Sequence, residues 1–185
     1  ADLFRIVPIG IGPDGEPRFP LVTFYLNAAD IRAGLELGAA PEIVPNDYFL
    51  QISGLEVIHD PTRLPFGRVI GVGLDTGDGV LPLDPTDTST CYKVVTTSYV
   101  AGLLGVVESF TMGLLAVNAK DADCETLIDP TTRFIDADPD TDGVQILKQW
   151  QALLRYVSEL PDADDDGVPN IPPFYGATQG RIVVQ

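Results

Sequence analysis

The sequence predicts an α+β fold, in which a mixed sheet packs against helices in mixed α/β layers. Three observations lead to this class. Runs rich in β-branched residues are interleaved with helical patterns, their spacing is not that of regular βαβ units, and 18 glycines and 16 prolines predict many turns. Hydrophobic residues make up 45% of the 185 residues, which is enough for a substantial core. We therefore expect residues 1–185 to form a single domain.

The first half of the chain is expected to contain one helix and several strands. The helix is predicted at residues 27–39, because Asn27 is a favoured N-cap residue and Gly38 a favoured stop. Strands are predicted from runs of apolar and β-branched residues at 3–9, 20–26, 48–60 and 68–74.

The second half is expected to contain two helices. The most apolar run, residues 99–117, is interrupted by Glu108 and lacks flanking cations, which favours a buried helix over a membrane span. Residues 144–160 repeat apolar side chains every three and four positions and end before Pro161, as expected of a helix with one buried face. The other segments are predicted as a loop and two strands, at 75–89, 91–100 and 181–185.

The predicted strand at 48–60 has an irregular alternation. Leu50 and Ile52 point to one face, but the next apolar residues of that face come an odd number of positions later. One extra residue must therefore be inserted, and Ser53-Gly54 is the natural place for such a β-bulge. The opposite face, where polar side chains are expected, then carries Phe49, Gln51 and Ser53.

The charge and the cysteines limit the partners and the compartment. With 27 acidic and 11 basic residues the net charge is −16, so the chain repels phosphate backbones and anionic lipid. We expect no nucleic-acid partner and no membrane insertion, but a soluble protein able to collect cations. Cys91 and Cys124 could form one disulfide in an exported protein or remain two buried thiols, and the sequence leaves both open.

Most catalytic apparatus is missing from this chain. Its single histidine, His59, excludes a histidine-rich two-metal site, and a Ser-His-Asp triad would have to use the same residue. A structural or exposed histidine is the favoured reading of His59. There is no P-loop, no GxSxG and no GxGxxG after a strand. Catalysis by this chain alone is not expected.

The first of two acidic clusters precedes the helix predicted at 144–160. Alternate carboxylates followed by Gly143 are typical of loops that wrap oxygen ligands around calcium. The alternative is an acidic cap, in which the carboxylates satisfy the free N–H groups of the helix and its positive dipole end. The cluster consists of Asp136, Asp138, Asp140 and Asp142.

The second acidic cluster follows Pro161. Its aspartates alternate before Gly167, a pattern similar to the calcium loops of thrombospondin type 3 repeats. The alternative is a solvated acidic turn, although so many like charges close together are costly without a counter-ion. The predicted calcium ligands are Asp162, Asp164, Asp166, the carbonyl of Val168, and Asn170.

Several motifs stand in an order that is similar to one known family. The most specific are "FLQISGLEVIHD" at 49–60 and "GRVIGV" at 67–72, accompanied by "ADLFRIVPIG", "YLNAADIRAGLELG" and "CYKVVTTSYVAG". Together they resemble the C-terminal domain of bacterial 5'-nucleotidases, a family that includes periplasmic UDP-sugar hydrolases and cyclic-nucleotide phosphodiesterases. The likeness spans nearly the whole chain.

The resemblance implies a division of labour. Such proteins carry an N-terminal metallophosphoesterase domain with divalent metals, while the C-terminal domain recognises the nucleotide or nucleoside. It implies a 5'-nucleotidase-like phosphoester hydrolase of nucleotide catabolism, in the periplasm or outside the cell. We expect the chain to be a fragment that lacks the N-terminal domain and the first part of its own domain.

The resemblance also assigns a residue to the base. The family holds the nucleoside base between two aromatic rings, and the ring at the start of the "FLQ" strand corresponds to Phe49, with Gln51 and Ser53 as nearby polar contacts. The alternative for Phe49 is packing under a loop.

One departure from the family pattern motivates an alternative function. The family's second ring follows a "GGDG" turn, whereas this chain has "AGLLGVVES", and Val106 occupies the place of the ring. Tyr99 or Phe110 would have to substitute for it. The alternative function is therefore a calcium-stabilised structural or interaction domain that has lost nucleotide binding.

Overall fold

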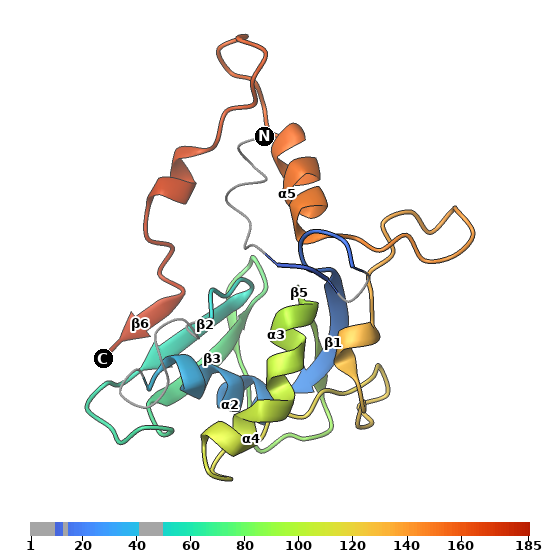
Figure 1. Ribbon diagram of the computed structural model, residues 1–185. Coiled ribbons are helices and arrows are strands. Elements are labelled where there is room, and N and C mark those ends of the chain that lie inside the picture. The colour runs from blue at the N-terminus through green and yellow to red at the C-terminus, as the bar shows by residue number, and fades with distance from the viewer. Residues whose placement is uncertain (1–9, 13–14, 41–49) are drawn as a thin grey trace. The chain divides into compact units, whose positions relative to one another are not determined.

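The structure is a computed structural model that describes residues 10–12, 15–40 and 50–185 (Figure 1). The chain divides into two compact units. The first unit comprises Ala1–Thr23, Val95–Ala101 and Pro130–Gln179, and the second comprises Phe24–Val94, Gly102–Asp129 and Gly180–Gln185. Helices combined with mixed sheets confirm the α+β class, whereas the single domain stays a prediction.

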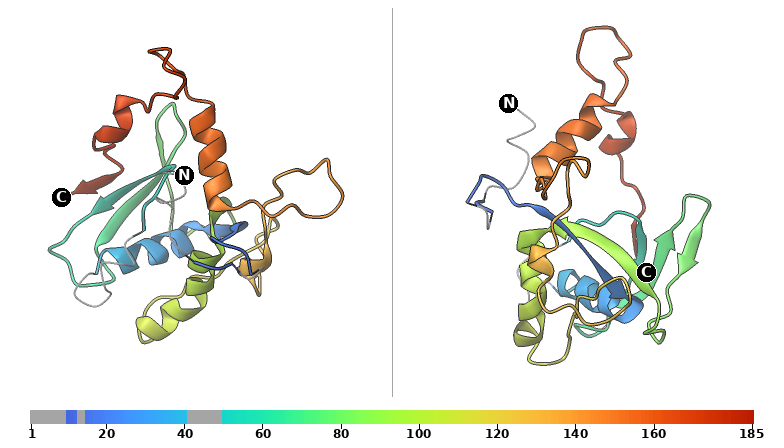
Figure 2. Two further views of the ribbon diagram at one scale, coloured as in Figure 1. Left: turned by 45° about the horizontal axis from the view of Figure 1, so that its top comes forward. Right: turned by 90° about the vertical axis from the view of Figure 1, so that its right-hand side faces the viewer.

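A four-stranded mixed sheet forms the frame of the second unit (Figures 1 and 2). Its order is β4 (Val80–Pro82), β3 (Val69–Asp75), β2 (Leu55–His59) and β6 (Ile182–Val184). The β2–β3 and β3–β4 pairs are antiparallel, and β6 pairs with β2 in parallel. The strands predicted at 68–74 and 181–185 are confirmed, and the predicted loop at 75–89 contains the short strand β4.

Helix α2 (Ala28–Gly38) belongs to the same unit and begins and ends as predicted. The Asn27 side chain accepts a hydrogen bond from the Asp30 backbone N–H at 2.9 Å, which caps the first turn. The buried Ile31 of this helix contributes to the core with apolar side chains of the sheet, Val57, Val69 and Val72.

Two further strands form a separate two-stranded sheet, β1 (Leu21–Asn27) with β5 (Cys91–Thr97). Strand β1 alternates between buried and partly buried side chains up to Leu26, and its buried residues are Val22, Phe24, Leu26 and, at its end, Asn27. Both strands were predicted, although the run at 91–100 turns helical at Ser98.

The apolar run at 99–117 does not form one buried helix, so that prediction is wrong. It contains α3 (Ser98–Leu103), a 3₁₀ turn (Leu104–Val106) and α4 (Val107–Phe110), after which the helix stops. Glycines within the run lower its helix propensity, and Gly113 has a φ of +82° that a helix excludes. Met112 is 85% exposed. No helix among the described residues is both long and apolar enough to cross a membrane.

The strand predicted at 48–60 is shorter than expected, and the bulge lies elsewhere. Residues 53 and 54 form a bend, and Gly54 has a φ of +77°. The ladder therefore begins only at Leu55, and its register shifts between Ile58 and His59. A bend before the strand changes the alternation as effectively as a bulge within it.

In the first unit, α5 (Gln149–Ser158) is shorter than the helix predicted at 144–160. The residues before it are extended instead: Ile146 bridges Asp136, and Lys148 bridges Pro20. The Lys148 N–H donates to the Gln151 side chain at 2.7 Å, which caps the helix at this point. Two 3₁₀ turns, Pro130–Thr132 and Pro173–Gly176, complete the unit.

Candidate ligand-recognition site

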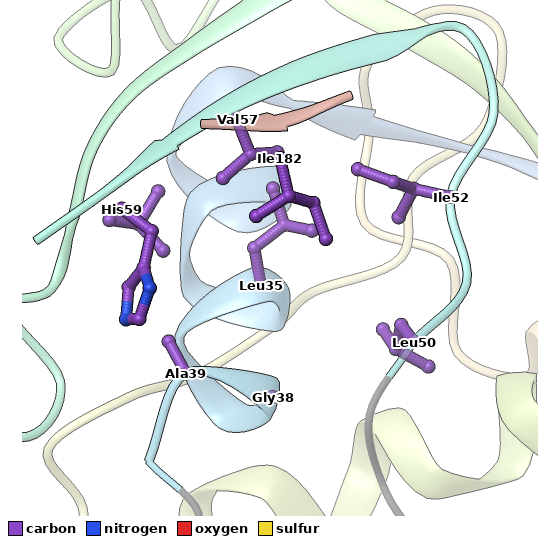
Figure 3. A pocket seen from close by; sticks show the side chains of 9 residues that line it. Leu35, Gly38, Ala39, Leu50, Ile52, Val57, His59 and Ile182 are labelled. Carbon is purple, nitrogen blue, oxygen red and sulfur yellow. The ribbon is translucent and has the colours of Figure 1, made fainter. Parts of the chain in front are cut away.

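The segment before β2 presents two polar side chains to solvent. Gln51 and Ser53 are exposed, whereas Leu50 and Ile52, which alternate with them, are partly buried and line a pocket (Figure 3). The guanidinium of Arg181 donates to the Ile52 carbonyl at 3.2 Å and fixes the segment against β6. The predicted alternation of exposed and partly buried side chains around Gln51 is therefore present. Phe49 lies outside the described residues.

The pocket itself is an apolar gap between α2 and the sheet, with a volume of about 60 Å³. His59 is its only ionisable lining residue, and Nε2 of this ring is buried without a hydrogen-bond partner among the described residues. The pocket is lined by Leu35, Gly38, Ala39, Leu50, Ile52, Val57, His59, Val69 and Ile182.

Among the described residues that line the pocket, the imidazole of His59 is the only group that could exchange a proton. Figure 3 shows Val57, Ile182 and Leu35 gathered beside His59.

Two buried carboxylates in the second unit were missed by sequence reasoning. Glu36 is 1% exposed, and its two oxygens accept from the backbone N–H groups of Arg68 at 3.0 Å and Val69 at 2.8 Å. Asp30 accepts from the Asn118 N–H at 2.9 Å and lies 4.0 Å from the Lys120 ammonium. Both groups hold segments distant in sequence together. The only feature of the sequence that pointed to a buried carboxylate was Glu36 within the apolar stretch "GLELG".

The cysteines that the sequence left open are bonded to each other. Cys91 and Cys124 form a disulfide with a Cα–Cα distance of 5.8 Å, and they are 33 residues apart. The bond joins the start of β5 to a turn in which the Asp121 side chain accepts from the Asp123 and Glu125 N–H groups, each at 3.0 Å. It ties this turn to the sheet.

The second acidic cluster brings three of its predicted calcium ligands together. Oxygen atoms of Asp162, Asp164 and Asp166 all lie within 4.8 Å of one another. The Asp162 carboxylate accepts from the Gly167 N–H at 2.8 Å, and the Asn170 side-chain NH₂ donates to the Asp164 carboxylate at 3.4 Å, while its oxygen accepts from the Ala163 N–H. Carboxylate oxygens gathered in a tight loop suit a hard cation such as calcium. Calcium itself stays a prediction.

The first acidic cluster is arranged differently. Among the described residues, the carboxylates of Asp136, Asp138, Asp140 and Asp142 do not form such a group. The Asp136 side chain accepts from the Gln145 N–H at 3.1 Å. The alternative of an acidic helix cap is wrong, because α5 begins at Gln149 and its N-cap is Lys148, six residues after the last aspartate.

The aromatic residues considered as substitutes for a second ring are all partly exposed. Tyr99 is 53% exposed and packs one face against Phe19, with ring centroids 5.2 Å apart. Phe110 is 49% exposed, and Val106, at the expected ring position, is 39% exposed. Exposed rings can stack on a base, but no contact among the described residues assigns that role to either.

Comparisons with known proteins complete the description. A model of the family "5'-nucleotidase, C-terminal domain" matches residues 1–112. The structure is similar to a 5'-nucleotidase precursor of Thermus thermophilus with a TM-score of 0.56 and 22% identity, over 90% of this chain and 25% of that one. The structure of Haemophilus influenzae NAD nucleotidase gives a TM-score of 0.41 with 20% identity, over 52% of this chain and 17% of that one.

A third structure, the Thermus thermophilus sulfate thiohydrolase SoxB, gives a TM-score of 0.34 with 20% identity, over 60% of this chain and 23% of that one. The search of the curated proteins found no match. The chain spans only a quarter of the length of the T. thermophilus 5'-nucleotidase precursor. Because the family model covers more than half of the sequence, the chain belongs to the 5'-nucleotidase C-terminal domain family.

Proposed function

We propose that this chain is the nucleotide-recognition part of a 5'-nucleotidase-like phosphoester hydrolase of nucleotide catabolism. Its membership in the C-terminal domain family carries the proposal. Gln51 and Ser53 are exposed at the edge of the "FLQISG" motif and are available to contact a ligand. Phe49, which the resemblance assigns to base stacking, precedes them in the same motif.

Catalysis is assigned to another part of the parent protein. Members of this family carry an N-terminal metallophosphoesterase domain, and we propose that such a domain holds the divalent metals and cleaves the ester. Within the present chain the only histidine lines an apolar pocket. The role of this chain is then to hold the base and ribose, so that binding energy positions the phosphate at the metals.

Calorimetry with AMP and adenosine tests the recognition role. Stacking of one base on one aromatic ring contributes about 1–3 kcal/mol, so Phe49→Ala is expected to weaken binding by roughly 5- to 150-fold. Gln51→Ala and Ser53→Ala are expected to weaken it less. Thr88→Ala, an exposed residue of a distant loop, serves as the control. Equal affinity of the wild type and Phe49→Ala would remove Phe49 from this role, and no binding of either ligand would reject the proposal.

The disulfide supports a proposed location in the periplasm or outside the cell. Structural disulfides persist in oxidising compartments and are rare in the cytosol, and Cys91–Cys124 joins two segments of the second unit. Alkylation of the protein taken from its native cells, before and after reduction, counts the free thiols. Two alkylated cysteines without reduction would contradict this location.

A second candidate function is a calcium-stabilised structural or interaction domain that has lost nucleotide binding. The convergence of the Asp162, Asp164 and Asp166 carboxylates favours it. Here the ion would offset the repulsion between these charges, with the Val168 carbonyl and Asn170 as further ligands. The loop geometry also fits, because Gly167 has a φ of +85°, which glycine adopts without strain.

Thermal melting after chelator treatment distinguishes the two functions. Under the second, millimolar calcium raises the melting temperature and nucleotides do not, because only a ligand of the folded state stabilises it. Asp164→Asn is expected to abolish the calcium effect, whereas Asp140→Asn, in the other acidic cluster, is the matched control. An unchanged melting temperature in calcium would contradict this function without affecting the test with AMP.

A further inference from the structure

Three aromatic rings of the first unit form an exposed surface that neither nucleotide recognition nor calcium explains. We call Tyr156, Phe174 and Tyr175 the aromatic face. They are 46%, 56% and 51% exposed, respectively. Tyr175 packs edge-to-face against both others, with ring centroids 6.3 Å from Tyr156 and 5.2 Å from Phe174. Clustered exposed rings commonly mark an interaction site.

The rings hold one another in place. The Tyr156 and Tyr175 hydroxyls share a hydrogen bond, which joins the last turns of α5 to the 3₁₀ turn Pro173–Gly176. This bond raises the pKa of the Tyr156 phenol above its usual 10.0. A face fixed in this way loses little conformational freedom when a partner binds.

The surroundings of the aromatic face are strongly acidic. Residues 154–176 contain five acids and one base, a net charge of −4. The only base, Arg155, donates to the Ala137 carbonyl at 3.1 Å. The acids are Glu159, Asp162, Asp164, Asp165 and Asp166.

The acidic loop begins close to the aromatic face along the chain. The Asn170 N–H donates to the Pro161 carbonyl at 2.8 Å, which closes the loop at its base. Pro161 follows Tyr156 by only five residues, on the order of 10 Å, and this is about one Debye length at physiological salt. The loop (the upper orange turn in Figure 1) directly follows α5.

These features select a cationic partner. The face of an aromatic ring attracts ammonium and guanidinium groups, and nearby carboxylates strengthen the attraction. A second copy of the chain, at net −16, would be repelled, and so would nucleic acid or anionic lipid. Arginine suits the face better than lysine, because its planar guanidinium stacks on rings and also binds carboxylates.

We propose that the aromatic face, with the acidic loop beside it, binds an arginine-rich peptide segment. Guanidinium groups stack on Phe174 and Tyr175 while others pair with carboxylates of the loop. This inference does not depend on the proposed nucleotide role. Calcium bound in the acidic loop would neutralise part of the loop's negative charge and so weaken the binding of the peptide.

The test is a titration of the full chain with a tetra-arginine peptide, first in chelator and at low salt, followed by calorimetry and by NMR of the aromatic side chains. Each of Phe174→Ala and Tyr175→Ala is expected to weaken binding about 2- to 5-fold. Tyr156→Phe keeps the ring but removes the hydroxyl that holds Tyr175, so it is expected to weaken binding less than Tyr175→Ala does. Phe110→Ala, which removes an equally exposed ring of the second unit, is the matched control.

Because a chain of net −16 attracts any polycation, dependence on the rings decides the outcome. Tetra-lysine is expected to bind more weakly than tetra-arginine, and Asp164→Asn with Asp165→Asn is expected to reduce the affinity and its salt dependence. Equal affinities of the wild type, Phe174→Ala and Tyr175→Ala would mean that the peptide binds by unspecific electrostatic attraction, and this result would overturn the proposal. Ring shifts with a neutral oligosaccharide but not with tetra-arginine would also overturn it.

Discussion

Removal of the Glu36 carboxylate is expected to destabilise the second unit strongly. The two oxygens of this side chain accept the backbone N–H groups of Arg68 and Val69 at the start of β3. Glu36 is 1% exposed, so water cannot replace it in Glu36→Ala without opening the structure. The substitution therefore leaves one buried donor, the Val69 N–H, and one partly buried donor, the Arg68 N–H, without a partner.

The magnitude follows from those two donors. A buried polar group that loses its partner costs about 1–3 kcal/mol, so the two together cost roughly 2–6 kcal/mol. Part of this is returned, because a buried carboxylate no longer has to be desolvated. We expect Glu36→Ala to lower the free energy of unfolding by about 2–4 kcal/mol. Glu36→Gln keeps one acceptor and is expected to cost roughly half as much.

Urea unfolding followed by circular dichroism measures this effect, with the free energy taken from the midpoint and slope. Glu108→Ala, at an exposed position of α4, is the control and is expected to change the free energy of unfolding by less than about 0.5 kcal/mol. If Glu36→Ala cost no more than Glu108→Ala, the two hydrogen bonds would not be holding α2 to β3 and the reasoning would fail.

Three further predictions concern the same fold. Asn27→Ala removes the side-chain acceptor of the Asp30 N–H and is expected to cost about 1 kcal/mol in urea unfolding; an unchanged midpoint would contradict the cap. Reduction of the disulfide is expected to lower stability by about 2–4 kcal/mol, whereas the Cys91→Ala/Cys124→Ala variant should not respond to the reducing agent. Hydrogen bonds from Thr90 and Ser89 lower the pKa of Asp87 well below its usual 3.8. Because the folded pKa is depressed, the stabilising contribution is present above pH 3.8 and is lost as the pH falls through the folded pKa; NMR titration should show a higher pKa of Asp87 in Ser89→Ala, and an unchanged value would refute this cause.

Local patterns predicted the elements whose determinants lie within a few residues. The run of apolar and β-branched residues at 20–26 predicted β1, and the Asn27 cap with Gly38 as a stop predicted α2. The apolar run at 99–117 was misjudged, because hydrophobicity alone does not show where glycines break a helix. The helix predicted at 144–160 is too long at its start, because Ile146 and Lys148 form isolated bridges with Asp136 and Pro20 instead.

In the candidate sites, too, local patterns predicted some features, whereas others depend on contacts between distant segments. The exposure of Gln51 and Ser53 could be predicted from a period of two, and the alternation of Asp162, Asp164 and Asp166 predicted a loop that gathers carboxylates. The bonds of Glu36 reach 32 and 33 residues along the chain, and the disulfide spans 33. No pattern within a short window contains such pairs.

By itself, the sequence determined the α+β class, the family motifs and the residues able to carry chemistry, because periodicity, capping and residue type act over one or two turns of chain. Only the tertiary structure decided which carboxylate supports β3, which strand borders β2, and which rings meet beside the acidic loop. Those outcomes depend on contacts between segments far apart in sequence, whose free energy is gained only when the whole fold brings them together.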